Sequence, residues 1–518
     1  MIRSSALRVC QGWAAGSRRT SIPTTITAAA TVGTNVERLE RFLHSTTFKF
    51  NTSEEEKGIK WRFPVDNWTK AMMRSVDRGM CVTIIFTLNS KAPITPDLME
   101  EALVHLYGKI ESFRTCFRMR DGQLWVADMP RNKLDFQVVG STDLEHEHSE
   151  LQKVKFDLHN GPLWNARLMT CPPDAPCPLP EVKAAYPYQC YLLMSAHHAA
   201  NDGGTLLLMP DLLISIIDSL LEGSPVDTRP VGELRDGVEA RMEGNRIRAE
   251  LERDPEKLMA SLKKHLATKH LPLLMEAYGV PKEADPTTIY SQPVLIDKEI
   301  MEKIAAKSCS IGASLSSCLN AILNISVMEV AREAGLERDV YNISTRLAVS
   351  SRRLMKSCES FPLGYHAIPF THCISTPRDV KKNFWQYVER LHTEIHEKLN
   401  RNYMCEEMVL AELLNTEGSA HEAKFAREQF DFDHFFSNLC SFEASQQKGV
   451  GKNAQITAEN YYLRFHNKNY PLAQMVFPFR GNLCLQNYCS TRAIDSRVAN
   501  RCLEKNVSTL YDVSKMVD

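Results

Sequence analysis

The sequence lacks a strong net charge, although it is 518 residues long. Its 62 Lys and Arg residues oppose 63 Asp and Glu residues, which gives a formal net charge of −1. Nucleic acids and anionic membranes attract basic surfaces, so this balance provides no electrostatic argument for either partner. Hydrophobic residues make up 43% of the chain and charged residues 24%, an ordinary globular composition with enough length for two cores.

The chain also lacks a long apolar run and a metal-binding cysteine pattern. A membrane-spanning helix needs roughly 18 apolar residues in succession, and the best stretch, 206–221, is interrupted by Pro210 and two aspartates. The 15 cysteines have no regular spacing, which favours reduced intracellular thiols over a disulfide framework. Cys171 and Cys177 flank a proline-rich loop rather than the two-residue spacing of a zinc site. We therefore predict no transmembrane segment and no metal.

Acidic residues are missing from residues 1–36, where four arginines lie among many Ser, Thr and Ala residues. This composition is typical of a mitochondrial transit peptide, whereas the apolar core of a secretory signal is missing. A disordered tail of chance composition would have the same features, and Pro23 interrupts the helical pattern. We therefore exclude the N-terminal tail or transit peptide, residues 1–57, from the fold, and expect an intracellular protein that is cytoplasmic or mitochondrial.

Strand and helix patterns alternate through the rest of the chain, which predicts an α/β fold. Residues 80–88 are rich in β-branched side chains and predict a strand. Residues 96–104 predict a helix, because Thr95 is a suitable N-cap and proline fits the first helical position. Residues 226–285 are highly charged, with helical spacing of apolar residues and several prolines. They predict a helical connection between an N-terminal part, 58–225, and a C-terminal part, 286–518.

The most informative stretch is Ser-Ala-His-His-Ala-Ala-Asn-Asp-Gly-Gly at 195–204. It follows an aromatic and apolar run at 188–194, which predicts a buried strand, and precedes an apolar segment that predicts a helix. Adjacent residues of an extended chain point to opposite faces, so either His197 or His198 can face a given cavity, but not both. The two glycines allow a positive φ or a close backbone approach at the turn.

This stretch resembles the His-His-x-x-x-Asp-Gly motif of the chloramphenicol acetyltransferase-like superfamily, with matching residues at His197, His198, Asp202 and Gly203. The superfamily includes peptide-synthetase condensation domains, plant acyltransferases and fungal alcohol acetyltransferases. Upstream, 156–163 resembles the family's Phe-Asp-Leu and Gly-Pro-Leu segment, and 113–117 resembles its Leu-Arg-Thr-x-Phe segment. The plant branch fits poorly, because its Asp-Phe-Gly-Trp-Gly motif is missing. The resemblance implies two similar lobes with mixed sheets and an active-site tunnel between them.

Acyl transfer from a thioester needs a base for the acceptor and a donor for the oxyanion. Histidine is a natural base because its unperturbed pKa is near 6.5. The resemblance implies that His198 is this base, without an acyl-enzyme intermediate, and that His197 and Gly203 support the loop. Two alternatives remain for His198. It could be a hydrogen-bonded core histidine, or it could share a metal site with Asp202, although no third ligand is suitably spaced.

In the family, the aspartate of the motif turns away and pairs with an arginine. A buried aspartate without a cation would be costly, and Arg346, in a segment that resembles the family's Asn-x-Arg strand, is the candidate partner of Asp202. Ser437 and Asn438 stand where the family has Ser-Asn-x-Gly, and they are candidates for stabilising the oxyanion. An ordinary strand-end turn is the alternative for these two residues.

The resemblance implies an acyltransferase that moves an acyl group from acyl-CoA, a co-substrate rather than a permanently bound cofactor, to a small alcohol or amine. We prefer CoA to a carrier-protein thioester because no carrier signature is appended, and a condensation-type enzyme acting on carrier proteins is the alternative. A catalytically silent binding protein is the alternative from another class, because Tyr365 and Cys440 replace residues that the family usually has. A carnitine acyltransferase-like enzyme ranks lower, because its motif has a single histidine.

Overall fold

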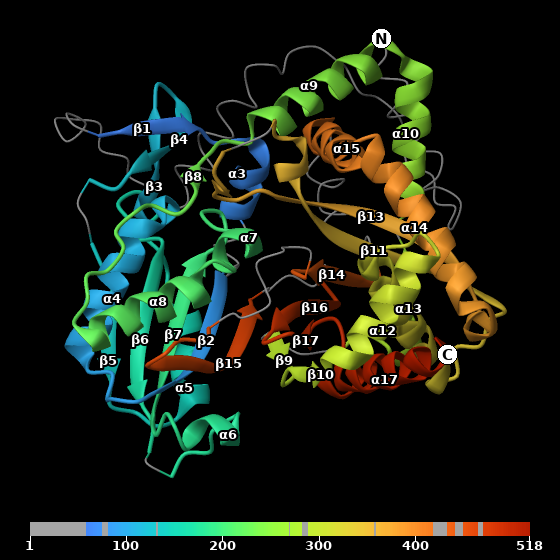
Figure 1. Cartoon of the computed structure of the whole chain (residues 1–518). Coiled ribbons are helices and arrows are strands. Elements are labelled where there is room, and N and C mark those ends of the chain that lie inside the picture. Colours follow the sequence, from blue (N-terminus) through green and yellow to red (C-terminus); the bar gives the residue numbers. More distant parts are fainter. Residues whose placement is uncertain are drawn as a thin grey trace.

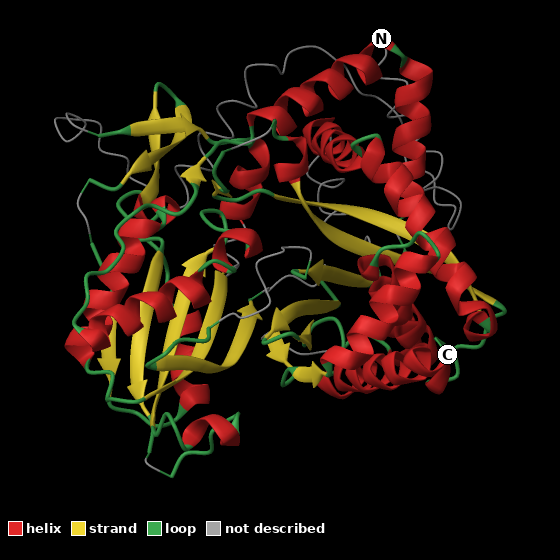
Figure 2. Ribbon diagram, in the orientation of Figure 1, coloured by secondary structure: helices red, strands yellow, loops and turns green. Residues whose placement is uncertain are grey.

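The structure is a computed structural model that describes residues 59–517 except 75–80, 131–132, 173, 269, 282–287, 357–358, 418–431, 441–448 and 465–469. The predicted tail or transit peptide, 1–57, lies outside the described residues. The predicted α/β class is confirmed: two lobes, each with a sheet and covering helices, lie side by side (Figure 1, Figure 2).

The first lobe is built on a five-stranded sheet in the order β15 (Ala454–Leu463), β2 (Cys81–Ser90), β7 (Tyr188–His197), β6 (Trp164–Thr170) and β5 (Phe136–Val139). Its pairs are antiparallel apart from the parallel β5–β6 pair. Strands β2 and β7 confirm the predictions for 80–88 and 188–194, and both are largely buried on both faces because helices lie on each side.

Two helices, α4 (Pro96–Lys109) and α8 (Met209–Glu222), share a core with one face of this sheet, and α5 (Leu144–Gln152) packs on the other. The predicted N-cap of α4 is confirmed, since Thr95 accepts a hydrogen bond from the backbone N–H of Leu98 at 3.2 Å. The lobe also contains the short helices α6 (Pro180–Lys183) and α7 (Gly203–Leu206).

Strand β15 comes from the predicted C-terminal part of the chain, 286–518, yet it belongs to the first sheet. It pairs antiparallel with β2, from Ala454 opposite Ser90 to Leu463 opposite Val82. A strand pattern in the sequence identifies the strand but not the edge with which it pairs, which is why the sequence did not indicate this crossing.

The second lobe is built on a seven-stranded mixed sheet. Its main path is β10 (Val294–Ile296), β17 (Asn482–Ser490), β16 (Leu472–Phe479), β14 (His434–Asn438), β11 (Val340–Ser350) and β13 (Ala367–Pro377), and β9 (Thr288–Tyr290) also pairs with β17. Strand β14 is parallel to both of its neighbours. The helices that share its core include α12 (Lys298–Ser310), α13 (Leu315–Glu333), α14 (Phe384–Asn400), α15 (Tyr403–Glu417) and α17 (Ser496–Lys515).

Two small sheets and a helical segment complete the fold. The strands β1 (Trp61–Pro64), β4 (Gln123–Asp128) and β3 (Thr115–Arg120) form one sheet, and β8 (Glu233–Leu234) pairs with β12 (Pro362–Leu363) in the other. Helix α3 (Asn67–Arg74) and helix α7 lie between the lobes in Figure 1. The segment 226–285 contains β8 and the helices α9 (Val238–Arg253), α10 (Pro255–Ala267) and α11 (Leu273–Tyr278).

By length and composition, one stretch of the described residues, Gly203–Glu222, is apolar enough to cross a membrane, and the bent pair α12–α13 would be a second. In the first stretch, 56% of the apolar window is buried inside the structure. Its buried residues pack against the first sheet, as the core helix of a lobe does.

A charged pair fastens the helical segment to the second sheet. His270 donates from Nε2 to the Oδ2 of Asp433 at 3.0 Å and from Nδ1 to the carbonyl of Thr268 at 2.9 Å. The carboxylate also accepts the backbone N–H groups of Leu273 and Ser344, each at 2.7 Å. Burial alone would lower the pKa of His270, but the hydrogen bond and charge of Asp433 raise it to about 9.

This pair predicts a loss of stability at alkaline pH. Because the folded pKa of His270 is raised, the pair stabilises fully below the unfolded pKa, near 6.5, and its contribution is lost as the pH rises towards about 9. We expect His270→Gln to lower the free energy of unfolding by about 1–3 kcal/mol at pH 6 and by less at pH 9.5, measured by urea denaturation. An equal loss at both pH values would contradict the charged pair.

Candidate active site

The histidine motif lies where β7 ends and α7 begins. His197 is the last residue of β7 and faces Cys81 of β2, and His198 follows it directly. Asp202 caps α7, because its Oδ1 accepts the backbone N–H of Thr205 at 3.0 Å. The sequence therefore places His198 in a tight turn between a buried strand and a helix start.

The ring of His198 is held in one orientation by the backbone. Its Nδ1 lies 2.9 Å from the carbonyl oxygen of Asn201. A carbonyl can only accept a hydrogen bond, so Nδ1 carries the proton and the neutral ring keeps a lone pair on Nε2. Burial lowers the pKa of His198, and the Asn201 carbonyl and the charge of Asp202 oppose this in part. The ring is therefore neutral at pH 7 and able to accept a proton, and the residue as a whole is half-buried.

His197 is fully buried and has a different environment. Its Nδ1 accepts the backbone N–H of Ala199 at 3.0 Å, and its ring packs near Phe117 and Phe156. Burial, with a smaller effect of His198, lowers its pKa to about 3. His197 therefore holds the turn as a neutral, buried acceptor, while the ring of His198 lies beside Tyr365.

Asp202 is buried and pairs with Arg352, not with the predicted Arg346. Two nitrogens of the Arg352 guanidinium lie 2.6 and 3.0 Å from the two carboxylate oxygens, and the backbone N–H of His366 donates to Oδ2 at 2.9 Å. Burial alone would raise the pKa of Asp202, but the charge and hydrogen bonds of Arg352 hold it below its usual value. Both oxygens are occupied, so this carboxylate is not available as a metal ligand beside His198.

The predicted pairing of Asp202 with Arg346 is wrong. Arg346 lies in the middle of β11, and its guanidinium binds Glu407 of α15 at 3.0 Å and the hydroxyl of Thr371 at 3.1 Å. Arg352 lies in the 3₁₀ turn Ser351–Leu354 that follows β11, and this turn is the part that reaches the motif. The resemblance to the family's strand pointed to Arg346 in β11. The arginine that reaches Asp202 is Arg352, in the turn that follows this strand.

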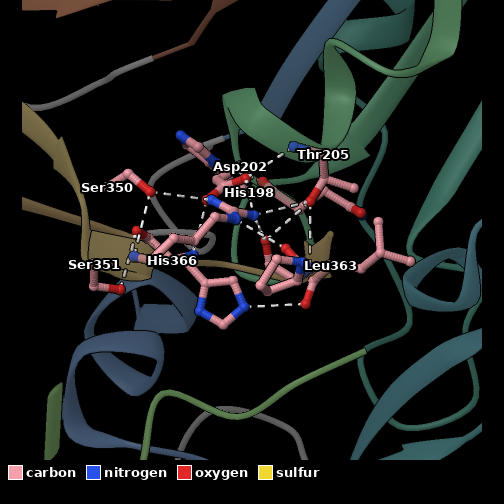
Figure 3. A network of polar contacts seen from close by, with 11 residues as sticks. His198, Asp202, Thr205, Ser350, Ser351, Leu363 and His366 are labelled. Atoms are coloured by element: carbon pink, nitrogen blue, oxygen red, sulfur yellow. Dashed lines mark hydrogen bonds and ion pairs between the residues drawn. The ribbon is translucent and has the colours of Figure 1, made fainter. Parts of the chain in front are cut away.

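Thr205 adds a second link between the lobes (Figure 3). Its hydroxyl donates to the carbonyl of Gly364 at 3.2 Å and accepts the N–H of the same residue at 3.3 Å. In the same loop, the carbonyl of His366 accepts the backbone N–H of Ser351 at 2.7 Å, and its Nε2 lies 3.0 Å from the carbonyl of Leu363. The loop between β12 and β13 and the turn after β11 are therefore fixed against the motif as one network.

Gly203 lies close to the end of β14. A Cβ at this position would lie 2.6 Å from Cδ2 of Leu439, the residue that follows β14. This contact brings the end of β14, with Ser437 and Asn438, to the motif. The Oδ1 of Asn438 accepts the backbone N–H of Cys440 at 2.8 Å, which fixes the turn after the strand. The structure thus places both oxyanion candidates on the strand that ends at the motif, and their role stays a prediction.

Ser112 is a further contact of the motif that the sequence analysis missed. Its hydroxyl donates to the side-chain oxygen of Asn201 at 2.5 Å, and both residues are buried. The backbone carbonyl of Asn201 is the group that orients His198. The two residues are 89 positions apart, so no local pattern could have indicated the contact.

A cavity opens between the lobes beside the motif. It is lined by the end of β1 and the turn that follows it, by β3 and β4, by residues 234–237 before α9 and by the loop between β12 and β13. Ala199 and Ala200, which follow His198, form part of its wall. Tyr365 also lines it, and the Tyr365 ring meets the His198 ring edge-on with centroids 5.3 Å apart. Within the described part of the chain, His, Cys, Asp and Glu side chains form no group of three that could hold a metal.

Solved structures share this architecture along most of the chain. The first condensation domain of the calcium-dependent antibiotic synthetase, in complex with a substrate analogue, superposes with a TM-score of 0.61 at 12% identity, covering 90% of this chain and 97% of that one. The condensation domain of the Monacolin K polyketide synthase MokA gives 0.59 at 14% identity, covering 88% and 98%. The trichothecene 15-O-acetyltransferase TRI3 from Fusarium sporotrichioides gives 0.56 at 12% identity, covering 87% and 95%.

The chain therefore has the two-lobed fold of these condensation domains and of the acetyltransferase TRI3, and the predicted resemblance is confirmed at the level of fold. By sequence, it matches no family model and no curated protein. The predicted tunnel between the lobes stays a prediction.

The pairing of Asp202 with Arg352 predicts a strong energetic coupling between them. We expect Arg352→Met to lower the free energy of unfolding by about 3–5 kcal/mol, because it leaves a buried carboxylate without its cation. In the double variant with Asp202→Asn, the loss should be smaller than the sum of the two single losses, by about 1–3 kcal/mol. Urea denaturation of the four proteins measures this cycle.

Arg346→Met provides the matched control, because Arg346 pairs with Glu407 instead. Its effect should add to that of Asp202→Asn within about 0.5 kcal/mol. Coupling of Asp202 to Arg346 rather than to Arg352 would contradict the pairing described here.

Proposed function

We propose that this protein is an acyltransferase that moves an acyl group from a CoA thioester to an alcohol or amine, with His198 as the general base. The observation that carries the proposal is the state of the His198 ring. Its Nδ1 is bound to the carbonyl of Asn201, so Nε2 of the neutral ring can take a proton. The fold, shared with condensation domains and an acetyltransferase, supports the same reaction class.

In the proposed reaction, the acceptor hydroxyl or amine attacks the thioester carbonyl carbon while Nε2 of His198 takes its proton. The tetrahedral oxyanion then collapses, the carbon–sulfur bond breaks, and the thiolate receives the proton from the imidazolium. The products are the ester or amide and free CoA, and the ring returns to its neutral state. No acyl-enzyme forms, because His198 acts only on the proton.

The oxyanion needs a donor close to His198. We assign this role to the segment Ser437–Asn438, because Leu439 packs on Gly203 and so holds the end of β14 at the motif. A hydroxyl or amide donor fixed in this position would stabilise the charge that develops on the carbonyl oxygen. In other enzymes, loss of such a donor lowers kcat by about 10²–10³-fold.

A carrier-protein thioester is the second candidate donor, because several solved structures with this fold are condensation domains of synthetases. Both donors present the same thioester carbonyl to the base. The proposed chemistry is therefore the same for either donor. The two donors differ in the group that carries the pantetheine arm, which is either the CoA nucleotide or a carrier protein.

The first test is thiol release from a panel of acyl-CoA donors with mixed alcohol and amine acceptors. We expect acceptor-dependent release by the wild type and a loss of about 10²–10⁴-fold in His198→Ala, the usual contribution of a general base. His146→Ala is the matched control, because His146 is exposed on α5 and its side chain makes no contact with the motif.

Release that is unchanged in His198→Ala would overturn the role of this residue. Tight acyl-CoA binding without release would favour the catalytically silent protein. Release seen with acyl carrier proteins but not with acyl-CoA would favour the condensation-type donor.

The lowered pKa of His198 predicts the shape of the pH profile. The base must be unprotonated, so kcat/KM should be level around pH 7–8 and should fall at acidic pH. Because burial lowers the pKa, the midpoint of the fall should lie below the ordinary value near 6.5. The profile is measured from pH 5 to 8, with re-assay at pH 7 after acidic incubation to exclude unfolding. A midpoint above pH 7 would assign the base to another group.

A further inference from the structure

The direction of one carbonyl decides how the His198 ring lies. This carbonyl belongs to Asn201, and its oxygen lies 2.9 Å from Nδ1 of His198. The peptide unit that contains it joins Asn201 to Asp202, and Asp202 is held from the second lobe by Arg352. One side of the peptide unit is therefore fixed by the ion pair, and the other side depends on what fixes Asn201.

The Asn201 side chain is fixed by a hydrogen bond from a distant turn. The hydroxyl of Ser112 donates to Oδ1 of Asn201 at 2.5 Å, and each residue is at most 1% exposed. A hydrogen bond in the interior is electrostatically stronger than the same bond in water. Within the described part of the chain, no acceptor binds Nδ2 of the same amide. The Ser112 hydroxyl therefore sets the position of this side chain.

Ser112 lies in a turn that the core of the first lobe holds in place. This 3₁₀ turn, Glu111–Arg114, leads directly into β3. The ring of Phe113 stacks on the ring of Trp164 in β6, with centroids 5.0 Å apart. Trp164 is paired with Ala196 of β7, the strand that leads into the histidine motif. Side-chain packing and strand pairing thus fix the serine hydroxyl relative to β7.

We propose that Ser112 and Asn201 are positioning residues for His198. The Ser112 hydroxyl holds the Asn201 side chain, and the Asn201 carbonyl then keeps the proton of the ring on Nδ1 and leaves Nε2 to take the proton of the acceptor. This inference rests on the proposed acyl transfer and adds two residues that act through the base. The ion pair of Asp202 holds the same peptide unit from the second lobe, whereas the Ser112 contact lies within the first lobe.

A weakened contact would change the tautomer of the ring. A neutral imidazole carries its proton on either nitrogen, and the hydrogen bond at one nitrogen decides which. If the Asn201 carbonyl turns away from Nδ1, the proton can occupy Nε2 instead. A neutral ring with its proton on Nε2 has no lone pair there for the acceptor proton. A misplacement of about 1 Å also costs up to about 10²-fold in rate, even when its cause lies away from the reacting atoms.

The test removes the Ser112 hydroxyl and follows both the rate and the tautomer. We expect Ser112→Ala to lower kcat in the thiol-release assay by about 10–100-fold and to leave KM within about twofold. Nitrogen NMR of ¹⁵N-histidine-labelled protein, with His198 assigned from the spectrum of His198→Gln, reports which ring nitrogen carries the proton. The proton should be on Nδ1 in the wild type and partly on Nε2 in Ser112→Ala.

A double variant tests whether Ser112 acts through Asn201. Asn201→Leu keeps a side chain of similar size and removes the amide that Ser112 binds. In that background, Ser112→Ala should cause no further loss of kcat beyond about twofold, because the contact is already missing. If the losses of the two single variants multiply in the double variant, the two residues act independently and the proposal is overturned.

Ser326→Ala is the matched control. Ser326 is as fully buried as Ser112, and its hydroxyl donates to the carbonyl of Ile322 at 2.9 Å within α13 of the second lobe. The variant removes the same group from another buried site, so it should keep kcat and the His198 tautomer. A fall of kcat in Ser326→Ala equal to that in Ser112→Ala would assign the effect to general destabilisation and overturn the proposal.

The pH profile gives a readout that destabilisation alone does not move. The Asn201 carbonyl opposes the effect of burial on the pKa of His198, so a misaligned carbonyl should lower this pKa further. The acidic midpoint of kcat/KM should therefore lie at lower pH in Ser112→Ala than in the wild type, and it should be unchanged in Ser326→Ala. A midpoint that is equal or higher in Ser112→Ala would contradict the positioning role.

The NMR spectrum separates this inference from the proposed function, because it needs no turnover. A tautomer change in Ser112→Ala, with no thiol release from any donor in the wild type, would support the positioning role and overturn acyl transfer. Acceptor-dependent release with kcat and tautomer unchanged in Ser112→Ala would overturn the positioning role and leave acyl transfer intact. A proton on Nε2 of His198 in the wild type would overturn both.

Discussion

The buried ion pair between Asp202 and Arg352 is the constraint on which the loop that carries His198 depends. Asp202 belongs to the first lobe and Arg352 to the turn after a strand of the second. Each charge would be costly in the interior without the other, so the lobes must dock in one arrangement for both to be satisfied. The residue before Asp202 supplies the carbonyl that orients His198. The position of His198 is therefore tied to the docking of the lobes through a single peptide unit.

The same arrangement distinguishes this site from a triad in which a carboxylate orients the histidine. Both oxygens of Asp202 are engaged by Arg352 and by backbone N–H groups, and a neutral carbonyl holds Nδ1 of His198 instead. A carbonyl stabilises the imidazolium less than a carboxylate does, so burial can keep the pKa of His198 low. The ring is therefore unprotonated at neutral pH.

Local patterns were sufficient to predict the elements that build the site. The β-branched run of β2, the cap and proline of α4 and the apolar run of β7 each depend on neighbours within a few residues. The partner of Asp202 could not be predicted from local patterns, because Arg352 is 150 positions away in the sequence. The family motif pointed instead to Arg346, in the strand before it. The hydrogen bond from Ser112 to Asn201 and the pairing of β15 with β2 could not be predicted for the same reason. Each is a contact between segments that are far apart in the sequence.

The passage of β15 into the first sheet has a consequence for how such a protein can be divided. A fragment that ended before the second half would leave the edge of β2 without its partner strand, and an unpaired edge invites association with other chains. The second half alone would carry a strand with no sheet to join. A single break between the two halves of the chain would therefore separate β15 from the sheet to which it belongs.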